Sequence, residues 1–161
     1  MFSNNQIKTL RNIFRIVNRF MVFMWRIGLG KFINIWPAVG GRIMVIRHTG
    51  RKTGKERLMP VNYAIADGEI YCTAGFGANS DWYRNITARP LVELWLPDGK
   101  YPALAQDITD SPQRLFLLRQ VLIASGFAAS LFANMNPRKM TDEKLAAATS
   151  TYRLIHFKRE K

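Results

Sequence analysis

The pair Asp67-Gly68, set between two apolar segments, is the feature of this sequence that most restricts its fold. Asp-Gly between extended segments is the strongest short-range signal for a two-residue β-hairpin of type I′, in which both central residues have positive φ. Asp98-Gly99 repeats the signal between residues 91–96 and 101–105. The middle of the chain is therefore predicted to be an antiparallel sheet built from hairpins.

A strongly basic turn separates the first two extended segments, residues 43–46 and 58–65. Gly50 and Gly54 permit positive φ, so their neighbouring backbone N–H groups are expected to converge on an anion such as phosphate or carboxylate. Arg51, Lys52, Lys55 and Arg57 surround them in sequence. The spacing excludes a nucleotide P-loop, because three residues rather than four separate the glycines and Glu56 follows Lys55. A solvated basic hairpin without a ligand is the alternative.

Composition limits the class of protein and of partner. The 161 residues are 48% hydrophobic, which is enough for one folded domain, and 24 basic against 11 acidic residues give a net charge of +13. That charge implies a polyanionic partner: nucleic acid, an anionic membrane surface or a small ligand with several charges. The single cysteine, Cys72, excludes an internal disulfide, fits a reducing compartment and is expected to be a buried apolar residue of a strand. Two histidines beside it give no metal site.

Residues 5–29 are predicted to form a helix that is both apolar and basic. Its polar stripe consists of Lys8, Arg11, Asn12, Arg15, Asn18, Arg19 and Arg26. These arginines interrupt the ~20 apolar residues that a membrane span needs, and no cleavage site of a signal peptide follows. The pattern fits a helix that lies on an anionic bilayer with Trp25 and Trp36 near the headgroups. A helix that covers an apolar face of the sheet is the alternative.

The other segments complete the predicted sheet and its helices. A glycine-rich loop after residue 74 leads into a short helix with Ser80 as its N-cap, and Pro90 ends it; Trp82 and Ile86 are expected to pack on the sheet. Ser111 followed by Pro112 predicts a second helix start, and Gly126 its end. Thr141 predicts the start of a third helix. Apolar and polar side chains alternate over residues 152–157, which are expected to form a last strand.

Two stretches, residues 49–54 with Arg57 and Pro60 downstream and Asp81-Trp82-Tyr83-Arg84-Asn85, together resemble the deazaflavin-dependent nitroreductase family. The resemblance covers roughly residues 40–108. It implies an α+β fold, a mainly antiparallel split β-barrel related to the flavin mononucleotide-binding barrels, with flanking helices. On this basis residues 1–39 are expected to be an amphipathic helix and connector, and residues 40–161 the cofactor-binding barrel.

The resemblance also implies a site for the reduced deazaflavin coenzyme F-420. Its phosphate and glutamate tail fall on the basic turn, and its ring system falls beside the next strand, the glycine loop and the short helix. The implied residues are Arg51, Lys52, Thr53, Arg57, Leu58, Met59, Pro60, Val61, Asn62, Thr73, Ala74, Gly75, Phe76, Asp81, Trp82, Tyr83, Arg84 and Asn85. Some relatives have tyrosine where Asn62 stands, and Tyr152 is the nearest equivalent of a tyrosine that shapes the acceptor pocket.

The activity implied is hydride transfer from reduced F-420 to an apolar acceptor such as a quinone, a nitroaromatic or an unsaturated lipid, with a proton from water or Tyr152. The coenzyme supplies this chemistry, so the chain needs no nucleophile. The alternatives are an FMN- or haem-binding barrel and a non-enzymatic membrane-binding module. No nucleic-acid-binding signature is present. We expect a cytoplasmic protein held on the inner face of the cell membrane; the sequence does not specify an oligomeric state.

Overall fold

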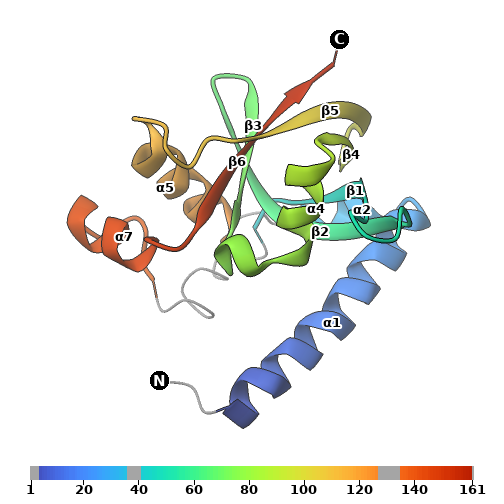
Figure 1. Cartoon of the computed structure of the whole chain (residues 1–161), viewed down its shortest axis with the longest axis horizontal. Coiled ribbons are helices and arrows are strands. Elements are labelled where there is room, and N and C mark those ends of the chain that lie inside the picture. Colours follow the sequence, from blue (N-terminus) through green and yellow to red (C-terminus); the bar gives the residue numbers. More distant parts are fainter. Residues whose placement is uncertain (1–3, 36–40, 127–134, 161) are drawn as a thin grey trace.

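Six antiparallel strands form a closed barrel in the computed structural model of this chain (Figure 1). The structure describes residues 4–35, 41–126 and 135–160, with side chains from residue 15 onward in these ranges. The strands are β1 (Ile43–Thr49), β2 (Glu56–Ala66), β3 (Glu69–Ala74), β4 (Leu91–Leu96), β5 (Gly99–Asp107) and β6 (Arg153–Arg159). Their order around the barrel is β1-β2-β3-β6-β5-β4, and β4 pairs with β1 to close it. The predicted antiparallel sheet is confirmed.

The helices lie outside the barrel or across its ends. They are α1 (Asn4–Arg26), α2 (Gly30–Ile33), the 3-10 turn η1 (Gly77–Asn79), α4 (Asp81–Ala88), α5 (Arg114–Ala124) and α7 (Asp142–Ala148). Helix α5 packs against β2 and β3, and α7 packs against α5. Helix α4 contacts β1 and β5. It therefore lies close to the turn between β1 and β2.

Inward-pointing side chains of every strand fill the barrel. Successive side chains of a strand point to opposite faces, so residues two apart share the interior. The largest fully buried members are Met44, Ile46, Ile70, Leu94 and Phe157. Burying each of these side chains contributes about 1.5–3 kcal/mol. The barrel is therefore a packed core, and ligand-binding space lies outside it.

The two predicted hairpins form with different turns. Ala66 pairs with Glu69, and the two loop residues Asp67 and Gly68 have φ of 51° and 79°, as predicted for type I′. In the second hairpin Leu96 pairs with Gly99, so the loop residues are Pro97 and Asp98. The prediction of Asp98-Gly99 as the turn is wrong, because Pro97 has no N–H with which to close a loop at residues 98 and 99; it lies in the loop itself, where its φ near −65° excludes type I′.

Helix boundaries follow the predicted signals with one shift. Thr141 caps α7, and its side chain accepts a hydrogen bond from the Lys144 N–H. Ser80 occupies the N-cap position of α4, although its side chain makes no capping bond. Helix α5 begins at Arg114, three residues after Ser111; the Ser111 hydroxyl accepts from the Gln113 N–H in a turn before the helix. Ser111 therefore starts a turn rather than the helix itself.

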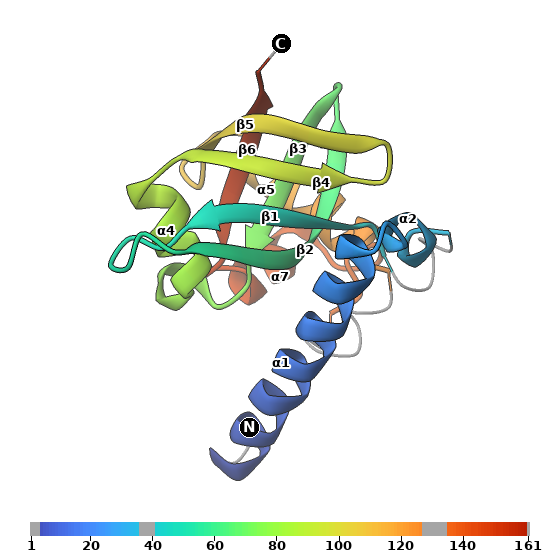
Figure 2. The ribbon, with the colours of Figure 1, turned by 90° about the vertical axis from the view of Figure 1, so that its right-hand side faces the viewer.

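Helix α1 extends away from the barrel, and only its C-terminal end packs against it (Figure 2). Trp25 is 8% exposed and contacts Val45 and Trp95 on the outside of the barrel. The expectation that Trp25 lies near lipid headgroups is therefore wrong, because its ring fills the joint between α1, α2 and the barrel. Trp36 lies outside the described residues. Among the described helices, none combines the length and the apolar content that a membrane span needs.

Cys72 lies in β3 with no exposed surface, which confirms that it is a buried apolar residue. Burial raises the pKa of its thiol far above the usual value. Because the thiolate is the reactive form, we expect an aromatic disulfide reagent to leave Cys72 unmodified in the native protein and to react fully in urea. Glutathione at the same pH serves as the control for reagent activity. Rapid labelling in native buffer would contradict the placement of Cys72 in the core.

Candidate functional site

The cationic turn, residues 50–55, is closed by its own backbone. The Gly50 N–H donates to the Lys55 carbonyl at 2.8 Å, and the Gly54 N–H donates to the Gly50 carbonyl at 2.9 Å. Gly54 has φ of +66°. A Cβ on Gly50 would lie 2.9 Å from Thr53 Oγ1 and 3.0 Å from Arg57 Nε, so a larger residue there would have to displace these two side chains.

The expectation that backbone N–H groups converge on an anion is largely wrong. Besides the two glycine amides, the Arg51 N–H donates to Asn85 Oδ1 and the Lys55 N–H to Thr53 Oγ1. Among the described residues, the amides of Lys52 and Thr53 are those of the turn left without such a bond. The turn therefore presents its charge mainly through side chains.

Arg51 joins the cationic turn to α4. Its guanidinium donates to Asn85 Oδ1 at 2.9 Å and to Asp81 Oδ1 at 3.1 Å. Asn85 is 4% exposed, whereas the Asp81 side chain is 84% exposed. A buried acceptor with charged donors is worth more than an exposed ion pair. Asn85 is thus the main anchor, and Arg51 has a positioning role in addition to its charge.

A hollow of about 520 Å³ lies between the cationic turn and α4; we call it the turn hollow. It brings together nine of the residues that the resemblance implies. They are Arg51, Lys52, Thr53, Arg57, Leu58, Met59, Asp81, Trp82 and Asn85. Basic side chains lie at its turn end, and Leu58, Met59 and Trp82 supply an apolar wall. The hollow therefore suits a ligand with an anionic part and a flat apolar part.

A second hollow continues from the first. It measures about 840 Å³, lies between α1 and β2, and shares Arg57, Leu58, Met59 and Asp81 with the turn hollow. We call it the α1 groove. Phe76, also implied by the resemblance, lines this groove and is largely exposed. The two hollows form one continuous surface along the start of β2.

The other implied residues lie away from the two hollows. Pro60 and Val61 are buried in the barrel wall, and Asn62 donates to the Arg42 carbonyl. Tyr83 points toward β5, where its hydroxyl donates to Asp107; burial, then this contact, raises the pKa of Tyr83. Arg84 Nε donates to the Ala78 carbonyl at 2.7 Å and so stabilises η1.

Thr73 and Ala74 end β3, and Gly75 follows them beside Tyr152. A Cβ on Gly75 would lie 3.5 Å from the Tyr152 ring, which also packs against α5 and α7 residues. Burial raises the pKa of Tyr152, so its hydroxyl keeps its proton at neutral pH. Tyr152 thus packs between the glycine loop and the residues of α5 and α7. Its role toward an acceptor stays a prediction.

His48 is a site residue that the sequence reasoning missed. It is 4% exposed and lines the turn hollow, and its Nδ1 has no hydrogen-bond partner among the described residues. The sequence contains an indication of this placement, because Met44, Ile46 and His48 alternate along β1 and so share its inward face. An unpaired buried nitrogen beside a hollow is suited to a hydrogen bond with a ligand.

Acidification is expected to destabilise the protein through His48. Burial, aided by the charge of Arg57, lowers the pKa of His48 below the usual value near 6.5. Between these two pKa values the unfolded chain binds a proton that the folded chain does not, so the free energy of unfolding falls as pH decreases below about 6.5, by up to about 1.4 kcal/mol per pH unit. Urea unfolding at pH 7 and pH 5.5 measures the loss, and His48→Gln should reduce it. An equal loss in the variant would contradict this role.

Comparison with known proteins gives a family and a fold. The family described as F-420H(2)-dependent quinone reductase matches residues 18–131, more than half of the chain. A conserved hypothetical protein from Mycobacterium tuberculosis superposes with a TM-score of 0.54 at 19% identity over 74% of each chain. An F-420-H(2) dependent reductase gives 0.50 at 20% identity, covering 74% of this chain and 94% of the other.

A heme binding protein from Mycobacterium smegmatis also has this fold. Its TM-score is 0.50 at 10% identity, with 74% of this chain and 48% of that chain covered. At such identities the structural likenesses establish the fold alone. They confirm the split β-barrel that the resemblance implies.

Proposed function

This chain belongs to the F-420H(2)-dependent quinone reductase family, and from this premise we propose that it transfers a hydride from reduced coenzyme F-420 to an apolar acceptor. A quinone, a nitroaromatic compound or an unsaturated lipid has the required character. The family makes the chain an oxidoreductase that depends on F-420. The observation that supports the proposed site is the turn hollow, where cationic and apolar side chains meet.

The residues of the turn hollow fit the coenzyme's two chemical parts. Ion pairs among the described residues use Arg47, Arg51, Arg119 and His156, which leaves Lys52 and Arg57 for an anion. These two side chains would bind the phosphate. Leu58, Met59 and Trp82 would lie beside the ring system and exclude water from it. The unpaired Nδ1 of His48 would supply one more polar contact.

The reaction needs positioning more than acid–base groups. When bound, reduced deazaflavin supplies a hydride, and one proton then completes the reduction of a quinone to its hydroquinone. Water or the protonated hydroxyl of Tyr152 is the proposed source of that proton. The chain's part is to hold an acceptor against the ring in a water-poor site, which is where proximity contributes most to the rate.

Exposed apolar side chains on α1 support a membrane-soluble acceptor. They are Ile16, Phe20 and Phe23 on the helix and Ile27 directly after it, which follow one another at three- and four-residue steps; each has half or more of its surface exposed. Such a stripe beside arginines favours binding in the interface of an anionic bilayer. We propose that α1 holds the protein on the inner face of the cell membrane. The wild-type protein should sediment together with vesicles rich in phosphatidylglycerol. The double variant Ile16→Ser with Phe20→Ser should leave a larger fraction of the protein in the supernatant.

Titration with three cofactors tests the proposed activity. Reduced F-420 should bind saturably, and adding a short-chain quinone should then return the deazaflavin absorbance of the oxidised coenzyme. Reduced FMN and haem are the comparison ligands, because the same fold occurs in a heme binding protein. Tight binding of FMN or haem with no binding of F-420 would refute the proposal. Equal rates with polar and apolar acceptors would refute the acceptor class alone.

A further inference from the structure

Four arginines line the α1 groove. Arg15, Arg19 and Arg26 come from α1, and Arg57 comes from the start of β2. On α1 the three arginines stand four and seven residues apart, which places them on one side of the helix. At a rise of about 1.5 Å per residue they extend over roughly 16 Å. The groove therefore has a row of positive charge along one wall and another arginine at the end that joins the turn hollow.

The acids of the α1 groove do not neutralise this row. Glu56 forms an ion pair with Arg47, and Asp81 forms one with Arg51. Among the residues that the structure describes, no ion pair uses an arginine of the groove. Like charges held side by side repel one another, and an anion that binds between them removes this repulsion. The groove is therefore suited to a ligand with several negative charges in a line.

The α1 groove begins where the turn hollow ends. Arg57, Leu58 and Met59 line both, so an extended ligand that starts at the cationic turn has a continuous surface toward α1. We propose that α1 forms the second wall of a groove that binds the acidic tail of coenzyme F-420, with Arg15, Arg19 and Arg26 each contacting tail carboxylates. This inference rests on the proposed placement of the coenzyme's phosphate at the cationic turn.

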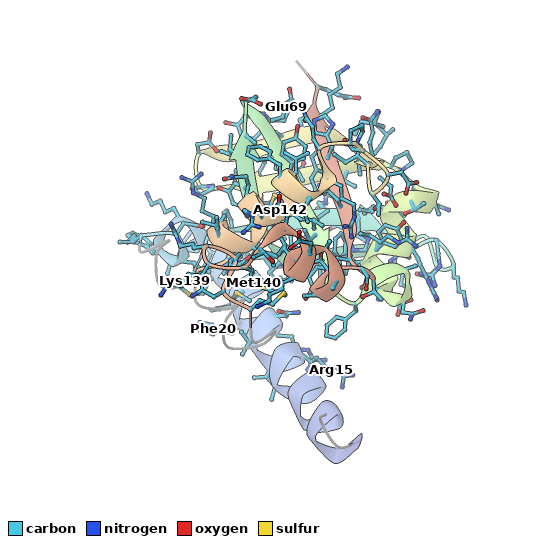
Figure 3. All side chains as sticks on the ribbon, turned by 90° about the vertical axis from the view of Figure 1, so that its left-hand side faces the viewer. Arg15, Phe20, Glu69, Lys139, Met140 and Asp142 are labelled. Atoms are coloured by element: carbon cyan, nitrogen blue, oxygen red, sulfur yellow. The ribbon has the colours of Figure 1, made fainter. Side chains whose placement is uncertain are left out.

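The length of the arginine row fits such a tail. An extended α-linked peptide covers about 3.3–3.6 Å per residue, and a γ-glutamyl link adds two bonds to each residue, so a tail of a few glutamyl residues reaches from Arg57 along the row. The tail contacts leave most of the apolar stripe of α1 free, because Arg15 and Phe20 leave the helix on different sides (Figure 3) and Phe23 is the stripe residue that lines the groove. One helix thereby serves two ligands: its arginines line the groove, whereas Ile16 and Phe20 do not.

The test compares two forms of the coenzyme and two triple variants. Dissociation constants are measured by coenzyme fluorescence for F-420 with several glutamates and for the form that has the phosphate but no glutamate. The groove variant carries Arg15→Gln, Arg19→Gln and Arg26→Gln. The control variant carries Arg42→Gln, Arg89→Gln and Arg138→Gln; these arginines are exposed, lie away from both hollows, and their replacement removes the same charge.

We expect the wild type to bind the tailed coenzyme more tightly than the tail-less form. The groove variant should lose about ten-fold or more of its affinity for the tailed form, as expected when three exposed ion pairs are lost, and bind the tail-less form as the wild type does. The control variant should keep the preference. High salt should weaken the preference of the wild type.

Three results would overturn the inference. The first is equal wild-type affinity for the two coenzyme forms, and the second is an equal loss in the groove and control variants. The third is a groove variant that keeps its coenzyme affinity but no longer binds phosphatidylglycerol vesicles, which would assign the arginines to lipid phosphates. Failure of the wild type to bind either coenzyme form would instead refute the proposed function itself, and the inference with it.

Discussion

Replacing Arg51 and Lys52 together by alanine is expected to weaken binding of reduced F-420 by about 100-fold or more, because Lys52 loses a charge-assisted contact of about 1.5–3 kcal/mol and the cationic turn loses the anchor that Arg51 forms on Asn85. Both side chains line the turn hollow. Fluorescence titration measures the dissociation constant. The matched control is Arg89→Ala with Lys139→Ala, two exposed cations away from the hollow. A loss no larger than that of the control would show that the coenzyme does not bind at the cationic turn.

The contribution of Arg51 has two parts that a second pair of variants separates. Asn85→Ala removes the acceptor of two Arg51 hydrogen bonds and changes no charge. It should weaken coenzyme binding by about ten-fold by freeing the turn from α4, and the salt dependence of binding should stay as in the wild type. Arg51→Ala should reduce that salt dependence as well, since a charge near the ligand is lost. Identical salt dependence in both variants would assign Arg51 a positioning role only.

The fold was predictable from the sequence where local chemistry decides the conformation. Asp67-Gly68 specifies its turn because both residues tolerate positive φ, and that hairpin sets the register of β2 against β3. Asp98-Gly99 is the same dipeptide, but it does not form the loop of its hairpin. There the preceding Pro97 lacks the N–H that would close the loop, and the loop lies one residue earlier, at Pro97 and Asp98. A dipeptide signal thus has to be read together with the residue before it.

The site was predictable in its residue types but not in its contacts. The cationic turn and α4 meet as expected, and nine implied residues line one hollow. Their pairing depends on tertiary distances: Arg51 and Asn85 are 34 positions apart, and their hydrogen bond converts an expected ligand contact into an anchor. The position of Trp25 likewise depends on tertiary contacts that the sequence pattern does not show. An aromatic residue on a basic helix suggests a membrane interface, whereas here it fills the joint with Val45 and Trp95.

Gly77→Ala is expected to lower the free energy of unfolding by about 2–5 kcal/mol. Gly77 has φ of +58°, and a Cβ there would lie 2.4 Å from the Thr151 carbonyl oxygen. The left-handed conformation alone costs a residue with a side chain about 1–2 kcal/mol. The clash adds about 1–3 kcal/mol, as overpacking does, because the neighbour is backbone and cannot change rotamer. Urea unfolding gives the difference from the wild type.

Gly68→Ala is the matched control, since Gly68 has φ of +79° and a Cβ there would meet no atom within 4 Å. It should cost only the conformational part, about 1–2 kcal/mol. The variants should also differ in coenzyme affinity. Gly77 begins η1, which leads directly into α4, so a shift there displaces Asp81, Trp82 and Asn85 from the turn hollow. Gly68 lies in the β2–β3 turn, and its replacement should leave affinity unchanged. Equal destabilisation with unchanged affinity in both variants would mean that the contact with Thr151 does not hold α4 in place.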